Sequence, residues 1–202
     1  MALSDQTPTP ADRLLAALPP EWPDDTLREQ VRARLAASGE VVVSLDDDPT
    51  GVQTVHGIRA LIEPTEADIA QEFRDAGTLF AILINTRAGG TDAAVATNRE
   101  IAAGLAAAAR ATGRRFSVIS RSDSTLRGHY PAETDALTEA LGPFDATLII
   151  PAFFEGGRIT VEDIHFVREG DQFTPAARTE FARDRIFGYG QSNLRRWVAE
   201  KT

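Results

Sequence analysis

Residues 41–51 read VVVSLDDDPTG, a short apolar run that ends in three aspartates and a Pro-Thr-Gly turn. The apolar part does not alternate with polar residues, which is typical of a strand buried on both faces of a parallel sheet. Three more runs repeat this pattern, at residues 79–84, 116–119 and 147–150. We therefore expect four strands of one sheet at these places.

Helical segments separate the predicted strands. Thr65 to Asp68 has the spacing of a capping box, and Thr91 opens a long alanine-rich segment that Gly113 ends. A third segment runs from about Pro131 to Leu141. Strands that alternate with helices predict an α/β fold with a doubly wound, mainly parallel sheet and helices on both faces.

The two ends of the chain differ from this central pattern. Residues 1–40 hold leucines at helical spacing interrupted by prolines, which predicts two short amphipathic helices in an N-terminal extension on the domain surface. Residues 164–167 and 172–174 flank a polar turn and predict a β-hairpin, and residues 193–200 predict a last helix. We expect residues 41–202 to form one domain that includes this C-terminal hairpin region.

Composition excludes several classes of function. The chain has 202 residues and a net charge of −9, so it lacks the basic balance of a general nucleic-acid-binding protein. It has no cysteine, which excludes disulfides, thiolate catalysis and cysteine-ligated zinc. It has neither a secretory signal pattern nor a long apolar span, so we expect a cytoplasmic protein that does not enter a membrane.

Polar loops follow all four predicted strands, at residues 46–51, 85–90, 120–128 and 151–158. Ligands of open α/β sheets bind at the carboxyl ends of the strands. We therefore expect the four loops to line a single crevice.

The aspartate loop has two readings of equal weight. Adjacent carboxylates repel one another, so Asp46 and Asp47 need a compensating partner, such as hydroxyl groups of a ligand. One of them would then act as a general base toward an alcohol, with Thr50 and Gly51 beside it. The other reading is a solvated Asp-Pro turn with a helix-capping aspartate. A metal site is a weaker third option.

The third loop is the strongest candidate for binding an acid group. It places six candidate binding residues within eight positions: Arg121, Asp123, Ser124, Thr125, Arg127 and Gly128. A guanidinium is a planar fork that matches a carboxylate, and the hydroxyls can donate to a sugar. The alternative is a structural Arg–Asp pair inside the loop, and we favour the binding role.

Other polar residues carry less weight. Asn85 directly follows an apolar run and is a good candidate, whereas Arg87 and Arg158 taken singly fit surface charge as well. The histidines His56, His129 and His165 share no metal-binding spacing and are expected to be structural or solvated. The chain also lacks the phosphate-binding glycine motifs and the esterase nucleophile motif. The residues alone thus indicate an α/β domain that binds a small polar anion.

Three ordered segments extend this interpretation. They read DDDPTGVQTVHG at 46–57, SRSDSTLRGH at 120–129 and PAFFEGGR at 151–158, supported by AETDAL at 132–137 and TEFARD at 179–184. In this order they resemble the four-carbon acid sugar kinase family, over about residue 41 to the C-terminus. The segment DSTLRG is the most specific of them.

This resemblance implies both a function and a division of labour. Such enzymes phosphorylate the terminal hydroxyl of tetronates such as threonate, erythronate or 3-oxo-tetronate, with ATP and Mg²⁺. Their N-terminal domain binds the sugar acid, and a C-terminal domain binds ATP. The resemblance places Asp46, Asp47, Arg121, Asp123, Ser124, Arg127 and Gly128 in the sugar-acid pocket, with Asn85 and Arg87 nearby.

Two departures from the family pattern limit what is carried over. The first loop reads DDDPTG rather than the simpler pattern of well-studied members, so their sugar specificity is not transferred. The chain ends at Lys201-Thr202, where a full-length kinase would enter its ATP domain. We expect one half of a kinase, which is inactive alone and binds no cofactor itself. Formation of a homodimer is left as a possibility. The alternatives are a non-enzymatic binding or regulatory domain that pairs with a separate ATP-binding chain, and a complete small hydrolase or isomerase.

Overall fold

The computed structural model describes residues 3–75 and 77–202, which form two compact units. The parallel-sheet unit comprises Trp22–Ser122 and Ala132–Asp145. The antiparallel-sheet unit comprises Met1–Glu21, Asp123–Pro131 and Ala146–Thr202. The chain therefore passes from one unit to the other inside the predicted third loop, between Ser122 and Asp123.

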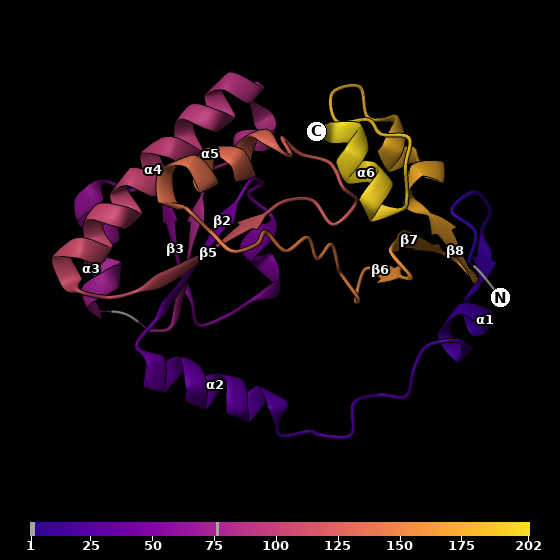
Figure 1. Cartoon of the computed structure of the whole chain (residues 1–202), viewed down its shortest axis with the longest axis horizontal. Coiled ribbons are helices and arrows are strands. Elements are labelled where there is room, and N and C mark those ends of the chain that lie inside the picture. Colours follow the sequence, from indigo (N-terminus) through magenta and orange to yellow (C-terminus); the bar gives the residue numbers. More distant parts are fainter. Residues whose placement is uncertain (1–2, 76) are drawn as a thin grey trace. The chain divides into compact units, whose positions relative to one another are not determined.

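The parallel-sheet unit contains four strands in the order β3-β4-β2-β5, and all neighbouring pairs are parallel. The strands are β2 (Val41–Asp46), β3 (Arg59–Ile62), β4 (Leu79–Leu83) and β5 (Phe116–Arg121). Four helices flank them, α2 (Leu27–Ser38), α3 (Glu66–Asp75), α4 (Thr91–Thr112) and α5 (Ala132–Leu141). Figure 1 shows α4 and α5 on one side of this sheet and α2 on the other. The expected α/β fold with a parallel sheet is confirmed.

The core of this unit lies between the sheet and helices α3, α4 and α5. Alternate residues of β2, Val41, Val43 and Leu45, are fully or almost fully buried against Phe73 of α3 and Leu105 of α4. Because side chains of a strand alternate between faces, this spacing directs one face of β2 into the core. The same strand ends at Asp46, so the core fixes where the aspartate loop begins.

Local signals in the sequence set the helix bounds of this unit. At the start of α3 the Thr65 hydroxyl accepts from the Asp68 amide at 3.2 Å, and Asp68 Oδ2 accepts from the Thr65 amide at 2.9 Å, so the predicted capping box is confirmed. Helix α4 ends at Gly113, whose φ of +68° suits glycine. The predicted bounds of these helices hold to within one residue.

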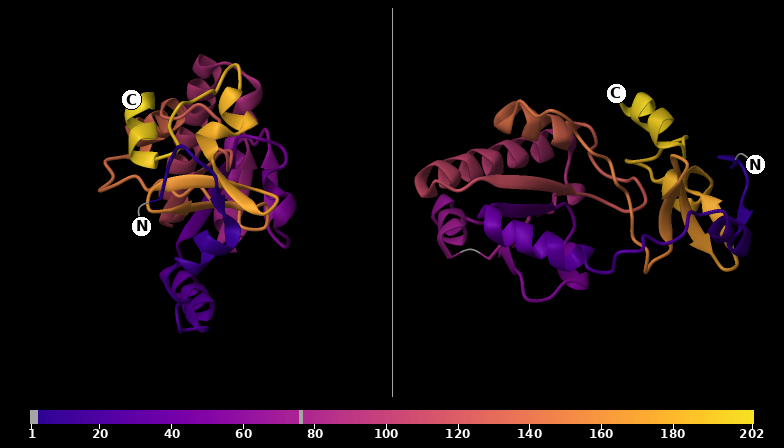
Figure 2. Two further views of the ribbon diagram at one scale, coloured as in Figure 1. Left: turned by 90° about the vertical axis from the view of Figure 1, so that its right-hand side faces the viewer. Right: turned by 60° about the horizontal axis from the view of Figure 1, so that its bottom comes forward.

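The antiparallel-sheet unit is built around a second four-stranded sheet, in the order β1-β8-β7-β6. The strands are β1 (Thr9–Pro10), β6 (Arg158–Val161), β7 (Ile164–Glu169) and β8 (Gln172–Pro175), with α1 (Ala11–Ala16) and α6 (Leu194–Lys201) beside them. Short 3₁₀ turns η3 (Ala176–Arg178) and η4 (Glu180–Arg183) follow β8. The predicted hairpin is confirmed as β7–β8, and the last helix begins where Asn193 caps it. Two further views of the ribbon are given in Figure 2.

Three features differ from the sequence prediction. Residues 147–150 form no strand, because they pair with no neighbour, and the side chains of Leu148 and Ile150 are exposed. The fourth place in the parallel sheet belongs to β3, a four-residue strand that we did not predict and whose residues are mostly exposed. Helix α2 forms as predicted but has no buried residue, so it lacks the amphipathic packing we expected.

Candidate functional site

The aspartate loop leaves the end of β2 and is held by backbone hydrogen bonds to its neighbours. The carbonyl oxygen of Asp46 accepts from the amides of Ile84 and Asn85, at 2.9 and 3.2 Å. The amide of Asp47 donates to the carbonyl oxygen of Arg121 at 3.3 Å. Since β2, β4 and β5 are parallel, their carboxyl ends meet at one edge, and the loops after them come together there.

The side chain of Asp46 is almost completely buried, and only one of its two carboxylate oxygens has a hydrogen-bond partner in the described part of the chain. Its Oδ1 atom accepts from the Ser44 hydroxyl at 3.1 Å and lies 3.5 Å from Arg121 Nη1. Its Oδ2 atom is buried and has no hydrogen-bond partner among the described residues. A buried carboxylate oxygen without a hydrogen-bond donor costs free energy of folding. A ligand hydroxyl that donated to this oxygen would remove that cost.

Gly51 lies directly against this carboxylate. A β-carbon added there would come within 2.8 Å of Asp46 Cγ and 2.9 Å of Arg121 Nη1. Both contacts are shorter than real side chains allow, so any other residue at position 51 would displace the Asp46–Arg121 pair. Glycine is therefore required here for space.

Arg87 compensates the other two aspartates. Its Nη2 atom lies 2.8 Å from Asp48 Oδ2 and 3.4 Å from Asp47 Oδ1. Asp47 Oδ2 in addition accepts from the Ser122 hydroxyl at 2.8 Å. The repulsion expected among the three aspartates is thus offset by arginines and hydroxyls of the same unit.

Asp48 matches the turn reading of this loop. Its Oδ1 atom accepts from the amide of Thr50 at 2.8 Å and from the Thr50 hydroxyl. The Thr50 hydroxyl, followed by its amide and Arg87, holds the pKa of Asp48 below its ordinary value, although partial burial opposes this. Asp48 is a turn residue, whereas Asp46 and Asp47 are the buried carboxylates.

Asn85 and Arg87 occupy the turn after β4. Asn85 has a φ of +48°, a left-handed conformation that asparagine tolerates better than most residues, and its side chain is exposed. The following η2 turn (Thr86–Ala88) directs Arg87 to the aspartates. A buried carboxylate anchors this turn, because Glu133 of α5 accepts from the Thr86 hydroxyl and from Asn98 Nδ2, the latter at 3.0 Å.

The Asp123–Gly128 loop belongs to the antiparallel-sheet unit and contains an internal ion pair. Arg127 Nε donates to Asp123 Oδ2 at 2.6 Å, and the Thr125 hydroxyl donates to the same oxygen. Leu126 is buried with a φ of +67°, and Gly128 has a φ of +141°. The Arg–Asp pair that we considered as an alternative is therefore present, and the loop is tightly folded.

Two buried side chains form hydrogen bonds to consecutive backbone carbonyl oxygens of this loop. His165 Nε2 lies 2.7 Å from the carbonyl oxygen of Ser124, and the Tyr189 hydroxyl donates to that of Thr125 at 2.7 Å. Burial is the main cause that lowers the pKa of His165 and raises that of Tyr189. Both groups are therefore neutral near pH 7.

Arg127 and Arg158 both contact the ring of Phe181. Their guanidinium carbons lie 5.2 and 5.6 Å from its centroid, within cation–π range. Arg158 also donates from Nη1 to the carbonyl oxygen of Gly156 at 2.7 Å, while its buried Nε atom has no partner among the described residues. These two cations around one ring form the part of this unit that best suits an anion.

The family model for a sugar-binding N-terminal domain matches residues 42–202 of this chain. The chain belongs to this family of sugar-binding domains. A D-erythronate kinase from Heliobacterium modesticaldum is 32% identical over 148 residues, which cover 71% of this chain and 32% of that enzyme. The resemblance to four-carbon acid sugar kinases is thus confirmed, and the chain spans about a third of the length of the curated relative it matches.

Solved structures agree with this sugar-binding domain in fold. A domain of unknown function from Bordetella bronchiseptica, crystallised with bound citrate as a domain-swapped dimer, superposes with a TM-score of 0.62 at 25% identity, over 80% of this chain and 41% of that one. A Haemophilus influenzae protein superposes with a TM-score of 0.56 at 18% identity, over 80% and 39% of the two chains. The second likeness shows the fold alone.

The structure divides the predicted site residues of this sugar-binding domain into two groups. Asp46, Asp47, Thr50, Gly51, Asn85, Arg87 and Arg121 lie together at the edge of the parallel sheet. Asp123, Ser124, Thr125, Arg127, Gly128 and Arg158 lie in the antiparallel-sheet unit. That all four loops line one crevice stays a prediction.

Several polar partners of these residues were not predicted. Ser44 and Ser122 lie in stretches that we singled out but were not named as site residues, and Tyr189 lies outside all of those stretches. Asp184, 3.8 Å from Arg127, belongs to the TEFARD segment, so a signal for it was present. His165 was expected to be structural or solvated, and the structure shows that it is a fully buried support of the Asp123–Gly128 loop.

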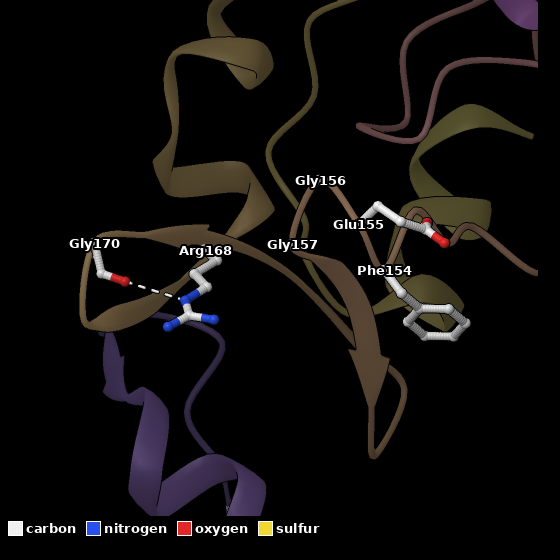
Figure 3. Close-up of a pocket in the computed structure, with 6 residues that line it drawn as sticks. All are labelled: Phe154, Glu155, Gly156, Gly157, Arg168 and Gly170. Carbon is white, nitrogen blue, oxygen red and sulfur yellow. Dashed lines mark hydrogen bonds between the residues drawn. The ribbon is translucent and has the colours of Figure 1, made fainter. Parts of the chain in front are cut away.

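An open pocket of about 320 Å³ lies elsewhere in the antiparallel-sheet unit. It is lined by Phe154, Glu155, Gly156, Gly157, Arg168 and Gly170. Figure 3 shows Phe154 and Arg168 on either side of the two neighbouring glycines, with Arg168 Nε donating to the carbonyl oxygen of Gly170. It contains none of the predicted site residues, although it borders Arg158 in sequence.

Residues 3–75 and 77–202 contain no group of three or more His, Asp or Glu side chains that could hold a metal ion. The aspartate cluster is the nearest approach to one, and arginines already occupy it. These residues therefore do not fit the Mg²⁺ that the family implies, and we derive no step through it. No helix in the described part of the chain is long and apolar enough to cross a membrane.

Proposed function

We propose that this sugar-binding domain is the substrate-binding half of an ATP-dependent kinase that phosphorylates the terminal hydroxyl of a four-carbon sugar acid. The observation that carries this proposal is the buried Asp46 carboxylate, with one oxygen lacking a donor, beside Asp47 and Arg121. The matched family and the D-erythronate kinase relative support it. ATP and Mg²⁺ belong in this proposal to a C-terminal kinase domain.

The two carboxylates have separate roles in this proposal. Asp47 accepts hydrogen bonds from substrate hydroxyls. Asp46 orients the terminal hydroxyl and accepts its proton as that oxygen bonds to the γ-phosphorus of ATP and the bond from this phosphorus to the leaving ADP breaks. Asp46 Oδ2 is buried beside Gly51, the first residue of the Gly51–Thr54 turn (η1). Thr50 and Asn85, both exposed, are hydroxyl and amide contacts at the edge of the site.

The acid group of the substrate is assigned to the arginines. Arg121 is partly exposed beside a buried carboxylate, and Arg87 is positioned next to it by the aspartates. In the antiparallel-sheet unit Arg127 and Arg158 provide cations that suit a carboxylate, with Ser124, Thr125 and Gly128 in the loop beside them. Arginine binds carboxylates through two parallel hydrogen bonds, which suits an aldonate.

Calorimetric titration of the chain with D-erythronate, D-threonate, L-threonate and ATP tests the proposal. We expect saturable binding of at least one tetronate, no binding of ATP, and no phosphoryl transfer by the chain alone. The variant Arg121→Ala should weaken tetronate binding by about tenfold or more, since a charge-assisted contact is lost. The matched control is Arg99→Ala, which removes an exposed arginine paired with Glu139 on the helices of the same unit.

The results separate the candidate functions. A folded chain that binds none of the tetronates would overturn the proposal. Turnover of a tetronate without nucleotide would favour a small hydrolase or isomerase. Tetronate binding together with a separately encoded ATP-binding partner would favour the stand-alone domain that pairs with another chain. We further propose a homodimer, supported by the domain-swapped dimer of the Bordetella relative, and sedimentation of the chain tests it.

A further inference from the structure

His165 connects one of the candidate substrate loops to strands β6 and β7. It lies on β7 with none of its surface exposed, opposite Thr160 on β6. One of its ring nitrogens contacts the Asp123–Gly128 loop, and the other contacts Thr160, whose hydroxyl reaches the start of the Pro151–Arg158 loop. All of these residues belong to the antiparallel-sheet unit.

The hydrogen-bond chemistry of these contacts selects one tautomer of the ring. A carbonyl oxygen only accepts, so Nε2 carries the hydrogen that it donates to the carbonyl oxygen of Ser124 at 2.7 Å. In a neutral ring Nδ1 is then an acceptor, and it takes the Thr160 hydroxyl hydrogen at 2.9 Å. Because Thr160 has a single hydroxyl hydrogen, its 3.3 Å contact with the carbonyl oxygen of Pro151 competes with His165 for it.

Burial of the ring favours this neutral form. Burial is the first cause that lowers the pKa of His165, and Arg158 adds to it, while the hydrogen bond to Ser124 and the charge of Asp123 oppose it. The folded pKa lies below the unfolded one, so this contribution to stability is present above the unfolded pKa and is lost as pH falls through the folded pKa. At neutral pH the ring therefore acts as one donor and one acceptor.

We propose that His165 is a positioning residue for sugar-acid binding, which fixes the loop of Arg127 to the paired strands β6 and β7, where Arg158 is the first residue of β6. Both arginines contact the ring of Phe181, so their separation depends on how the loop and β6 are held. A carboxylate that binds both guanidiniums requires that separation to be kept, because a misplacement of about 1 Å can lower the efficiency of a site about 100-fold. This inference rests on the proposed function and names a residue that never touches the ligand.

Three variants separate positioning from simple core packing. His165→Gln keeps an amide N–H at the reach of Nε2, so it preserves the donor to Ser124. His165→Leu fills the space but removes both hydrogen bonds. Thr160→Val leaves the contact between His165 and Ser124 and removes only the hydroxyl that donates to His165 Nδ1.

The experiment measures three quantities on each variant of the chain. Calorimetry gives the dissociation constant for D-erythronate, and thermal unfolding gives stability. Amide hydrogen exchange is read in residues 123–128, in residues 151–158 and in α4 as a distant reference. In the wild-type chain, ¹⁵N NMR of the imidazole reports which nitrogen carries the hydrogen.

We expect ¹⁵N shifts of an Nε2–H tautomer and about tenfold or weaker binding by His165→Leu. His165→Gln should recover most of this loss. Exchange should rise in residues 123–128 for His165→Leu but not for Thr160→Val, which keeps the bond between His165 and Ser124. Residues 151–158 and α4 should be unchanged in His165→Leu, because the freed Thr160 hydroxyl can still donate to Pro151. The inference would be overturned if His165→Leu unfolds at a lower temperature but matches the wild type in D-erythronate binding and amide hydrogen exchange. His165 would then contribute to core packing only.

Failure of the proposed function has a different signature. If the wild-type chain does not bind D-erythronate or any other tetronate, the proposed function is overturned, and with it the binding role of His165. The exchange data then still decide whether His165 holds the Asp123–Gly128 loop to β7. Faster exchange in residues 123–128 upon His165→Leu supports that mechanical role, and unchanged exchange rejects it.

Discussion

Tyr189 donates its hydroxyl hydrogen to the carbonyl oxygen of Thr125 at 2.7 Å, in the interior of the antiparallel-sheet unit. Replacing it in Tyr189→Phe removes the donor and leaves a buried carbonyl oxygen without this partner. We expect a loss of about 1–2 kcal/mol in the free energy of unfolding, measured by urea denaturation. An unchanged midpoint of unfolding would contradict this, since it would mean that the hydroxyl contributes nothing.

The same burial predicts an abnormal titration of Tyr189. Its pKa is raised by desolvation and by Asp123. In the folded chain its hydroxyl therefore stays neutral at pH values at which it would ionise in the unfolded chain. This contribution to stability is complete below the unfolded pKa and is lost as pH rises through the folded pKa. Ultraviolet titration of Tyr130→Phe, in which Tyr189 is the single tyrosine, should show ionisation only together with unfolding; a reversible step near pH 10 in the folded chain would be incompatible with it.

Gly51→Ala tests the closeness of the aspartate loop to Asp46. The new methyl group would lie within 3 Å of the Asp46 carboxylate and Arg121, so one of them must move. We expect D-erythronate to bind about tenfold more weakly or worse, while helix content by circular dichroism is unchanged. Gly77→Ala is the control, because a β-carbon there meets nothing within 4 Å, and it should bind like the wild type.

Acid stability should depend on the Asp48 turn. The Thr50 hydroxyl lowers the pKa of Asp48, so this contribution to stability is present above the unfolded pKa of an aspartate and is lost as pH falls through the lower folded pKa. Thr50→Val should therefore reduce the pH dependence of unfolding below about pH 4. Asp48→Asn should abolish the pH-dependent contribution of Asp48 to the free energy of unfolding. The idea fails if wild type, Thr50→Val and Asp48→Asn lose stability in parallel on acidification.

The Glu133 anchor predicts a large effect from a residue outside the candidate site. Glu133→Ala would leave the buried Thr86 hydroxyl and Asn98 amide without this acceptor, which we expect to lower the free energy of unfolding by about 2–4 kcal/mol. The control is Glu139→Ala on the same helix, where the side chain is exposed and paired with Arg99. It should change stability by less than about 0.5 kcal/mol, and equal effects of the two variants would argue against the anchor.

Elements with a continuous local signal could be predicted from the sequence. The run before Asp46 has the composition of a buried parallel strand, and Thr65 and Gly113 mark where helices begin and end, so these elements were right. Residues 147–150 have the same apolar composition and form no strand. A strand exists only where a neighbour supplies hydrogen bonds, and composition does not show whether that neighbour is present.

The candidate site could be predicted only in part for a related reason. Charged and glycine residues in the loops stand out in sequence, and Asp46, Arg87 and Arg121 indeed meet at one sheet edge. Their supports come from distant parts of the chain: Tyr189 lies 64 positions from Thr125, and Glu133 lies 47 positions from Thr86. A lone histidine or tyrosine carries no pattern that would reveal such a contact.

The unpaired residues 147–150 have a consequence for handling the protein. Leu148 and Ile150 are exposed on a stretch whose backbone belongs to no sheet, and Phe154 is exposed a few residues further on. Chymotrypsin-like proteases need an extended, accessible backbone next to a large apolar side chain, and this stretch offers both. Brief digestion should therefore cut here first, leaving the Asp46 cluster on the N-terminal fragment and Arg158 on the C-terminal one.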